Sequence, residues 1–202
     1  MRRLFELDSP LMTGLSHMGD WIIFSILSLI CSLPVITIGA AQVGIYTAMD
    51  RLQQCRVCTV KDYFQIVLEN VKQSIVLLGV ILLEMLLCGF GVWFYAIKGL
   101  RFIAIVFVCL LVFLLMSGVW IFPLQARFSN SIRRTMMNGV SCALLFPVRS
   151  ILAVVIQSIP LVVFLYSPSL FVYMSIVWIA FWPAVIADVS LRILRKPFNQ
   201  LS

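Results

Sequence analysis

The sequence predicts an all-α membrane protein with five transmembrane helices and two amphipathic helices at the cytoplasmic face. Of its 202 residues, 62% are hydrophobic and 11% are charged, whereas soluble domains are about 25% charged. The apolar residues gather in runs of the roughly 20 residues that a helix needs to cross about 30 Å of hydrocarbon. These runs are continuous and so differ from the alternating strands of a membrane β-barrel. We therefore expect residues 1–202 to form one integral membrane domain.

The expected spans follow one another in chain order. They cover residues 21–38, 74–97, 102–124, 148–166 and 170–187. A short hairpin at residues 98–101, with a glycine between two basic residues, joins the second and third spans. Pro34, Pro160 and Pro183 lie in the first, fourth and fifth spans. Membrane helices tolerate such kinks because neighbouring helices satisfy the freed carbonyl groups.

The net charge of +7 arises from 15 Lys and Arg residues against 8 Asp and Glu residues. Their distribution predicts an orientation, because cytoplasmic loops retain positive charge. One side of the membrane receives only Arg2, Arg3, Lys98 and Arg101, and the other side receives the remaining basic residues. This split predicts an outside amino terminus and a cytoplasmic carboxyl terminus. An alternative stays open: if the first apolar run is a re-entrant hairpin around Pro34, the amino terminus is cytoplasmic.

The first and third connections are predicted to form amphipathic helices along the cytoplasmic lipid surface. In the first connection, residues 42–54 form one helix. Thr59 and Asp62 then form a capping box that starts a second helical segment, which runs straight into the second span. In the third connection, Asn130 and Ser131 cap a helix. Its apolar face consists of Ile132, Met136, Val140 and Leu144.

Residues near the amino end resemble a known family. The run DSPLM at residues 8–12 precedes Asp20, which opens the first span, and the run CSLPVITIGAA follows at residues 31–41, with Tyr46 shortly after. This pattern resembles the signature of the YesL family, small bacterial multi-pass membrane proteins of unknown function. The resemblance implies a bacterial cytoplasmic membrane and an association with carbohydrate uptake, and it supplies no catalytic residues. Residues 55–58, CRVC, depart from the charged or glycine-rich link that is usual in the family.

Three residues of this signature have a physical interpretation. Pro34 ends or kinks the span, and the Thr37 hydroxyl can bond a freed carbonyl group. Gly39 then permits a left-handed or close-packed turn. We expect this signature turn to be architectural, with a ligand site as the alternative.

Glu84 is the most unusual single residue, because it lies in the middle of the second span. A charged carboxylate at that depth costs roughly 2.5–3.5 kcal/mol. It therefore needs a partner, a proton or water, and Gln157 and Arg149 of the fourth span are the candidate partners. Two interpretations stay open: an intramembrane proton or cation site formed by Glu84 with Gln157, or a protonated glutamate bonded to a neighbouring helix.

The remaining motifs favour ordinary structural roles. Cys55 and Cys58 have the spacing of a redox pair or of half a zinc site. The chain has no second pair of this kind, and its one histidine, His17, is expected on the opposite side, so we expect incidental thiols and no metal or cofactor. The basic residues Arg127, Arg133 and Arg134 are expected to contact anionic lipid headgroups, and not nucleic acid.

Three classes of function compete. The first is a non-enzymatic accessory or interaction protein, linked to a transporter for carbohydrate uptake. The second is a small transporter or channel subunit that uses Glu84 and must self-associate, because five spans are few for a transporter. The third, an intramembrane enzyme, has the weakest case, because the membrane interior offers one carboxylate and no histidine. The sequence favours the accessory protein.

Overall fold

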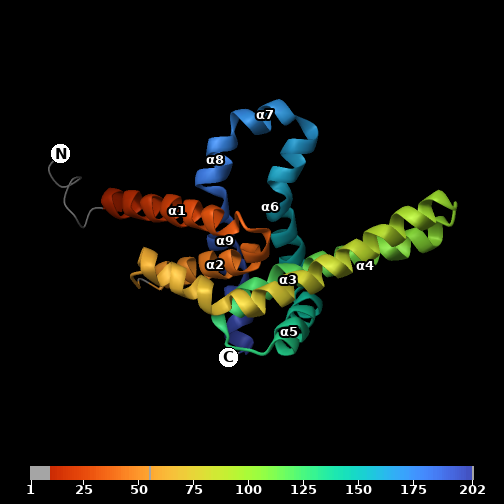
Figure 1. The fold of residues 1–202 in the computed structure, drawn as a ribbon, viewed down its shortest axis with the longest axis horizontal. Helices are drawn as coiled ribbons and strands as arrows, with labels where there is room; N and C mark the ends of the chain where they lie inside the picture. Colours follow the sequence, from red (N-terminus) through yellow and green to blue (C-terminus); the bar gives the residue numbers. More distant parts are fainter. Residues whose placement is uncertain (1–9, 55, 202) are drawn as a thin grey trace.

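The computed structural model describes residues 10–54 and 56–201, with the side chains of residues 18–54 and 56–194. Every regular element in this part of the chain is a helix, which confirms the all-α class. Figure 1 shows the order of the helices. They are α1 (Pro10–Ser32), the 3-10 turn η2 (Val35–Thr37), α2 (Ile38–Gln53), α3 (Val60–Ile97), α4 (Arg101–Arg127), α5 (Ile132–Leu145), α6 (Pro147–Tyr166), α7 (Pro168–Tyr173), α8 (Ser175–Ala180) and α9 (Trp182–Leu201).

Three of the described helices, α3, α4 and α6, are long and apolar enough to cross a membrane. They contain the second, third and fourth expected spans. Pro160 lies inside α6 without interrupting it, as expected. The apolar stretch of α1, Met18–Ser32, is shorter than these three helices. Length and composition thus support membrane helices, but they identify three such helices in the described residues, whereas the sequence predicted five.

The first apolar run ends earlier than the predicted boundary at residue 38. Helix α1 ends at Ser32, and Pro34, which has no amide hydrogen, cannot continue it. After η2 the chain reverses, and α2 runs back along α1 (Figure 1). The two helices therefore form a hairpin with its turn around Pro34.

The expected fifth span is not one helix. Residues 170–187 are divided among α7, α8 and the start of α9, with interruptions at Met174 and Phe181. Pro183 accounts for the second interruption. Without an amide hydrogen it cannot bond the carbonyl group four residues earlier, so a new helix begins with Pro183 in its first turn, where no such bond is needed.

The expected surface helix at residues 42–54 is wrong in its location, because α2 lies at the centre of the molecule. Helices α1, α3, α4 and α9 pack around it. A Cβ atom on Gly44 would lie 2.8 Å from a methyl group of Val67 and 2.9 Å from the ring of Tyr63, so α3 approaches α2 very closely. Small residues allow such approach between membrane helices. The buried hydrophobic residues of α2 are Ala40, Ala41, Val43, Ile45, Tyr46, Ala48 and Met49.

The next amphipathic segment is confirmed as the beginning of α3. The Thr59 hydroxyl accepts a hydrogen bond from the Asp62 amide at 3.2 Å, and the Asp62 carboxylate accepts one from the Thr59 amide at 2.9 Å. This is the reciprocal capping box that the sequence predicts. Helix α3 then continues without interruption for 38 residues, or about 57 Å at the usual rise per residue. It is much longer than the hydrocarbon core of about 30 Å, so only part of α3 could lie within such a core.

Helix α5 occupies the third connection, as expected, and part of its predicted apolar face points outward. Ser131 stands at the N-cap position without a side-chain capping bond. Small residues face the neighbouring helices, while Val140 and Leu144 are exposed. The buried residues are Thr135, Gly139, Cys142 and Ala143. An outward apolar face of this kind suits a helix that lies against lipid.

Two apolar hairpins leave the core in different directions. Helices α3 and α4 project together to one side, whereas α6, α7 and α8 form an arch (Figure 1). At the base of the first hairpin, the Ser74 hydroxyl donates to Gln125 at 3.2 Å. The fully buried Trp120 donates to the Ser150 hydroxyl at 2.8 Å and so ties α4 to α6. These polar contacts fix the junction from which both hairpins leave.

Candidate functional site

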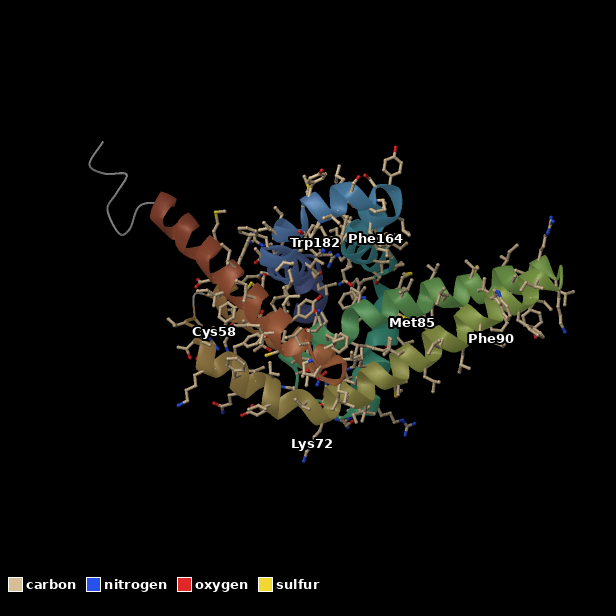
Figure 2. The ribbon with its side chains drawn as sticks, turned by 45° about the horizontal axis from the view of Figure 1, so that its top comes forward. Cys58, Lys72, Met85, Phe90, Phe164 and Trp182 are labelled. Carbon is tan, nitrogen blue, oxygen red and sulfur yellow. The ribbon has the colours of Figure 1, made fainter. Side chains whose placement is uncertain are left out.

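A cavity of about 550 Å³ lies at this junction, where α2, α3, α4, α6 and α9 meet. Its walls are largely apolar, with Met85 from α3, Phe122 from α4 and Trp182 from α9 among them. Figure 2 marks Met85 and Trp182 on their helices. Pockets for small ligands commonly have volumes of about 300–1,000 Å³ and mostly apolar walls. The cavity is therefore large enough for an organic ligand.

Four uncharged polar side chains interrupt the apolar lining. Gln42 and Tyr46 come from α2, and Gln157 and Ser158 come from α6. The Gln157 amide donates to the Tyr46 hydroxyl oxygen at 3.4 Å, which is long for a hydrogen bond. The Ser158 hydroxyl donates to the Val154 carbonyl at 2.6 Å. None of the described residues that line the cavity carries a charge.

Tyr46 is the most deeply buried of these polar groups, with 3% of its surface exposed. Burial raises the pKa of its phenol from 10 to about 12, because the charged phenolate would lose its solvation. The hydroxyl group therefore stays protonated at any physiological pH. It can donate and accept hydrogen bonds, but it cannot serve as a base.

Sequence reasoning singled out Gln157 but missed Gln42 and Tyr46. Tyr46 lies four positions after Gln42, so both side chains occupy one face of a helix. That spacing was visible in the sequence. The sequence prediction places this segment at the lipid surface, where exposed polar residues need no explanation.

Glu84 does not line the cavity, although Met85 beside it does. Its side chain is partly exposed on α3 and makes no hydrogen bond or ion pair within the described part of the chain. The structure does not join it to either expected partner. Gln157 bonds Tyr46, and the Arg149 guanidinium group lies over the Phe146 ring at 5.7 Å.

The signature turn of Pro34, Thr37 and Gly39 connects α1 to the core. The Thr37 hydroxyl donates to the carbonyl oxygens of Cys31 and of Pro34, so it satisfies groups freed at the end of α1. Gly39 does not adopt the left-handed conformation and lies within α2. A Cβ atom there would lie 3.0 Å from the Ser74 carbonyl oxygen, so the glycine serves close packing against α3. These contacts support the architectural interpretation.

The basic residues Arg127, Arg133 and Arg134 are exposed at the end of α4 and the beginning of α5. The Gln73 amide donates to the Asn130 carbonyl at 2.8 Å and draws α3 toward this region. Lys72, also exposed, precedes Gln73 (Figure 2). These residues lie close in the chain to the outward apolar face of α5. Basic side chains beside an apolar helix face suit a surface of anionic lipid headgroups.

The thiols offer little chemistry in this structure. Burial raises the pKa of Cys58, so its thiolate is less populated than that of an ordinary cysteine. Cys55 and the side chain of His17 lie outside the described residues. Among the residues that the structure does describe, no three histidine, cysteine, aspartate or glutamate side chains gather in a way that could hold a metal ion.

Sequence reasoning also missed Asp188, a buried carboxylate in α9. It accepts a hydrogen bond from the Gln53 side chain at 2.9 Å and another from Arg192 at 2.8 Å. The Gln53 amide also donates to the Asp188 backbone carbonyl at 3.0 Å. The contact with Gln53 joins α9 to the end of α2. A lone carboxylate four residues before an arginine was the available signal.

Comparison with known proteins assigns no family. No protein-family model, no curated protein and no solved structure matches the chain. The resemblance to the YesL family therefore gains no support from these comparisons and depends on the signature residues alone.

Proposed function

We propose that this chain is a non-enzymatic accessory protein of a bacterial cytoplasmic membrane, which acts by contact with another membrane protein. The observation that carries the proposal is the α3–α4 hairpin, which projects from the core (Figure 1). Both of its helices expose large apolar side chains, such as Leu86, Phe90 and Phe102. Lipid can cover such a surface, and the helices of a partner can pack on it in the same way.

The proposed orientation puts α5, its basic neighbours and the carboxyl terminus on the cytoplasmic side, with α7, α8 and α9 bringing the chain back across the membrane after α6. The excess of Lys and Arg in the connections on that side supports this orientation. The chain reversal at Pro34 supports a cytoplasmic amino terminus as well. We therefore favour the re-entrant alternative for α1 and α2, in which Arg2 and Arg3 also lie inside.

The resemblance of the signature turn to the YesL family supports a partner engaged in carbohydrate uptake. The partner that we propose is a membrane-embedded subunit of such a transporter. Its helices would pack along the projecting hairpin.

A second candidate function, a small oligomeric transporter or channel subunit, has the support of one observation. The Glu84 carboxylate has no polar partner within the described part of this single chain, and a second copy or an aqueous pathway would supply one. This candidate requires self-association with Glu84 facing the pathway.

Affinity purification from native membranes in a mild detergent tests the first proposal. We expect another membrane protein to accompany the chain. The variant Leu83→Ala with Leu87→Ala changes exposed side chains of the hairpin and should reduce the recovery of that protein. The matched control, Leu152→Ala with Val155→Ala, changes exposed side chains of α6 and should not.

Two results would contradict the accessory role. Recovery of the chain alone as a monomer would remove the proposed partner. Recovery of a homo-oligomer, together with a solute flux that Glu84→Gln abolishes while the protein still accumulates, would favour the transporter instead.

A further inference from the structure

The cavity changes in polarity from its mouth to its floor. Leu115 of α4 and Leu161 of α6 line it and are also exposed, by 37% and 61% respectively, so they mark where it opens. Both belong to helices that could span the membrane. At the other extreme, Tyr46 lies in the buried core. The cavity therefore opens between apolar side chains toward the bilayer and ends at polar groups inside the protein.

The amide groups at the polar end have unused hydrogen-bonding capacity. Gln42 makes no side-chain hydrogen bond within the described part of the chain, and the only bond of the Gln157 side chain is the long one to Tyr46. Amide groups in apolar surroundings are costly unless they find partners. A ligand with hydroxyl or carbonyl oxygens would supply those partners, and it would also satisfy a site that offers both donors and acceptors.

The absence of charge among the described lining residues restricts the ligand further. An anionic or cationic headgroup would enter this low-dielectric site without a counter-charge, which is strongly unfavourable. Solutes that are wholly polar do not match the apolar mouth. We infer that the cavity binds an uncharged amphiphile from the bilayer, with its oxygen-bearing head at Gln42, Tyr46 and Gln157 and its hydrocarbon chain between α4 and α6. This site is independent of the proposed partner on the α3–α4 hairpin.

Gly118 provides a way to fill the cavity without disturbing the fold. It lines the cavity, and a Cβ atom on it would have no other atom within 4 Å. Gly118→Leu should therefore occupy the ligand volume, and leucine is also a better helix former than glycine. Gly79→Leu is the matched control, because Gly79 has equally open surroundings but does not line the cavity.

The experiment uses the full-length protein in vesicles of phosphatidylcholine. Two photoactivatable diazirine lipids with identical acyl chains are compared: an uncharged diacylglycerol and an anionic phosphatidic acid. We expect the diacylglycerol probe to label peptides from α4 and α6 that line the cavity, and phosphatidic acid to label them much less. Gly118→Leu should reduce the labelling about tenfold, whereas Gly79→Leu should leave it unchanged.

A second variant keeps the proposal testable if Gly118→Leu fails to accumulate. Gln157→Leu keeps a similar side-chain volume but removes the amide, so it should weaken labelling by diacylglycerol while the thermal midpoint stays near that of the parent protein. Equal labelling by both probes, or labelling that neither variant changes, would show ordinary annular lipid and overturn the inference. Labelling confined to phosphatidic acid would overturn it as well.

Discussion

At the scale of single residues, Gly39 and Gly79 are both helical glycines with different surroundings. A Cβ atom on Gly39 would lie 3.0 Å from the backbone carbonyl oxygen of Ser74 and 3.1 Å from the Phe122 ring, whereas one on Gly79 would meet nothing within 4 Å. Replacing an open helical glycine by alanine stabilises a helix by about 1 kcal/mol, while overpacking costs about 1–3 kcal/mol. We expect Gly39→Ala to lower the free energy of unfolding and Gly79→Ala to raise it.

Denaturant titration in detergent, followed by tryptophan fluorescence, measures both changes. The expected difference between the two variants is about 2 kcal/mol and equals the packing cost, because both substitutions gain a similar helix propensity. If both variants gain stability equally, the close contact between α2 and α3 does not constrain the fold.

Tyr46 gives a residue-scale prediction about pH. Its folded-state pKa is raised from 10 to about 12, so the stability that burial of the neutral phenol contributes is fully present below pH 10. That stability is lost as the pH rises from 10 through about 12, because the unfolded chain ionises first. We expect the parent protein to lose more free energy of unfolding over this interval than Tyr46→Phe does. If the free energy of unfolding falls equally steeply with pH in the parent protein and in Tyr46→Phe, this phenol is not buried.

At the scale of elements, the Asp188 side chain accepts one of the two hydrogen bonds by which Gln53 of α2 holds α9, and the Asp188 backbone carbonyl accepts the other. Asp188 is buried and accepts from both Gln53 and Arg192, whereas 67% of the Arg192 side chain is exposed. Hydrogen bonds to a charged group contribute about 1.5–3 kcal/mol, and exposed ion pairs contribute about 0–1 kcal/mol. We therefore expect Asp188→Ala to cost about 2 kcal/mol or more, and Arg192→Ala less than 1 kcal/mol.

Hydrogen exchange followed by mass spectrometry locates this effect. Peptides from α9 should exchange faster in Asp188→Ala, while peptides from α3 and α4 should change little. Similar exchange of α9 in Asp188→Ala and Arg192→Ala would mean that the ion pair, and not the contact with Gln53, holds the helix.

The elements also show which parts of the fold the sequence could predict. Features that depend on neighbours in the chain were predictable: the apolar lengths of α3, α4 and α6, and the capping box of Thr59 and Asp62. The place of α2 could not be predicted, because its burial also depends on α4 and α9, which are distant from it in the chain. Its alanines and glycines give a weak hydrophobic signal, although small residues permit the closest packing.

The candidate site was predictable only in part, for the same reason. Gln157 is an amide in an apolar run, and such a local property is visible in the sequence. The cavity itself exists because the α1–α2 hairpin brings Gln42 and Tyr46 beside α6, and no local pattern encodes that contact. Glu84 shows that a local pattern can also mislead. It is a carboxylate in the middle of an apolar run, but it does not line the cavity of the described chain.

At the scale of the whole molecule, one membrane topology must be consistent with both the charge distribution and the two hairpins. The turn at Gly99 joins α3 to α4, and Ser167 joins α6 to α7, which carries Ser169, at the top of the arch, while α5 and its arginines join α4 to α6 on the other side. If α3, α4 and α6 each cross the membrane once, these two turns share one side. Because basic residues favour the cytoplasm, that shared side is expected to be the outside.

Single-cysteine variants in a background without the 6 native cysteines test this topology. We expect a membrane-impermeant maleimide to label Gly99→Cys and Ser169→Cys in intact cells, and Ser131→Cys only after permeabilisation. An amino-terminal epitope tag should also require permeabilisation, because the chain reverses at Pro34 and α2 returns along α1. Opposite labelling of Gly99→Cys and Ser169→Cys would mean that α6 does not cross the bilayer as α4 does. The cavity between them would then open toward a headgroup region instead of the hydrocarbon, and an uncharged amphiphile would lose its route into the site.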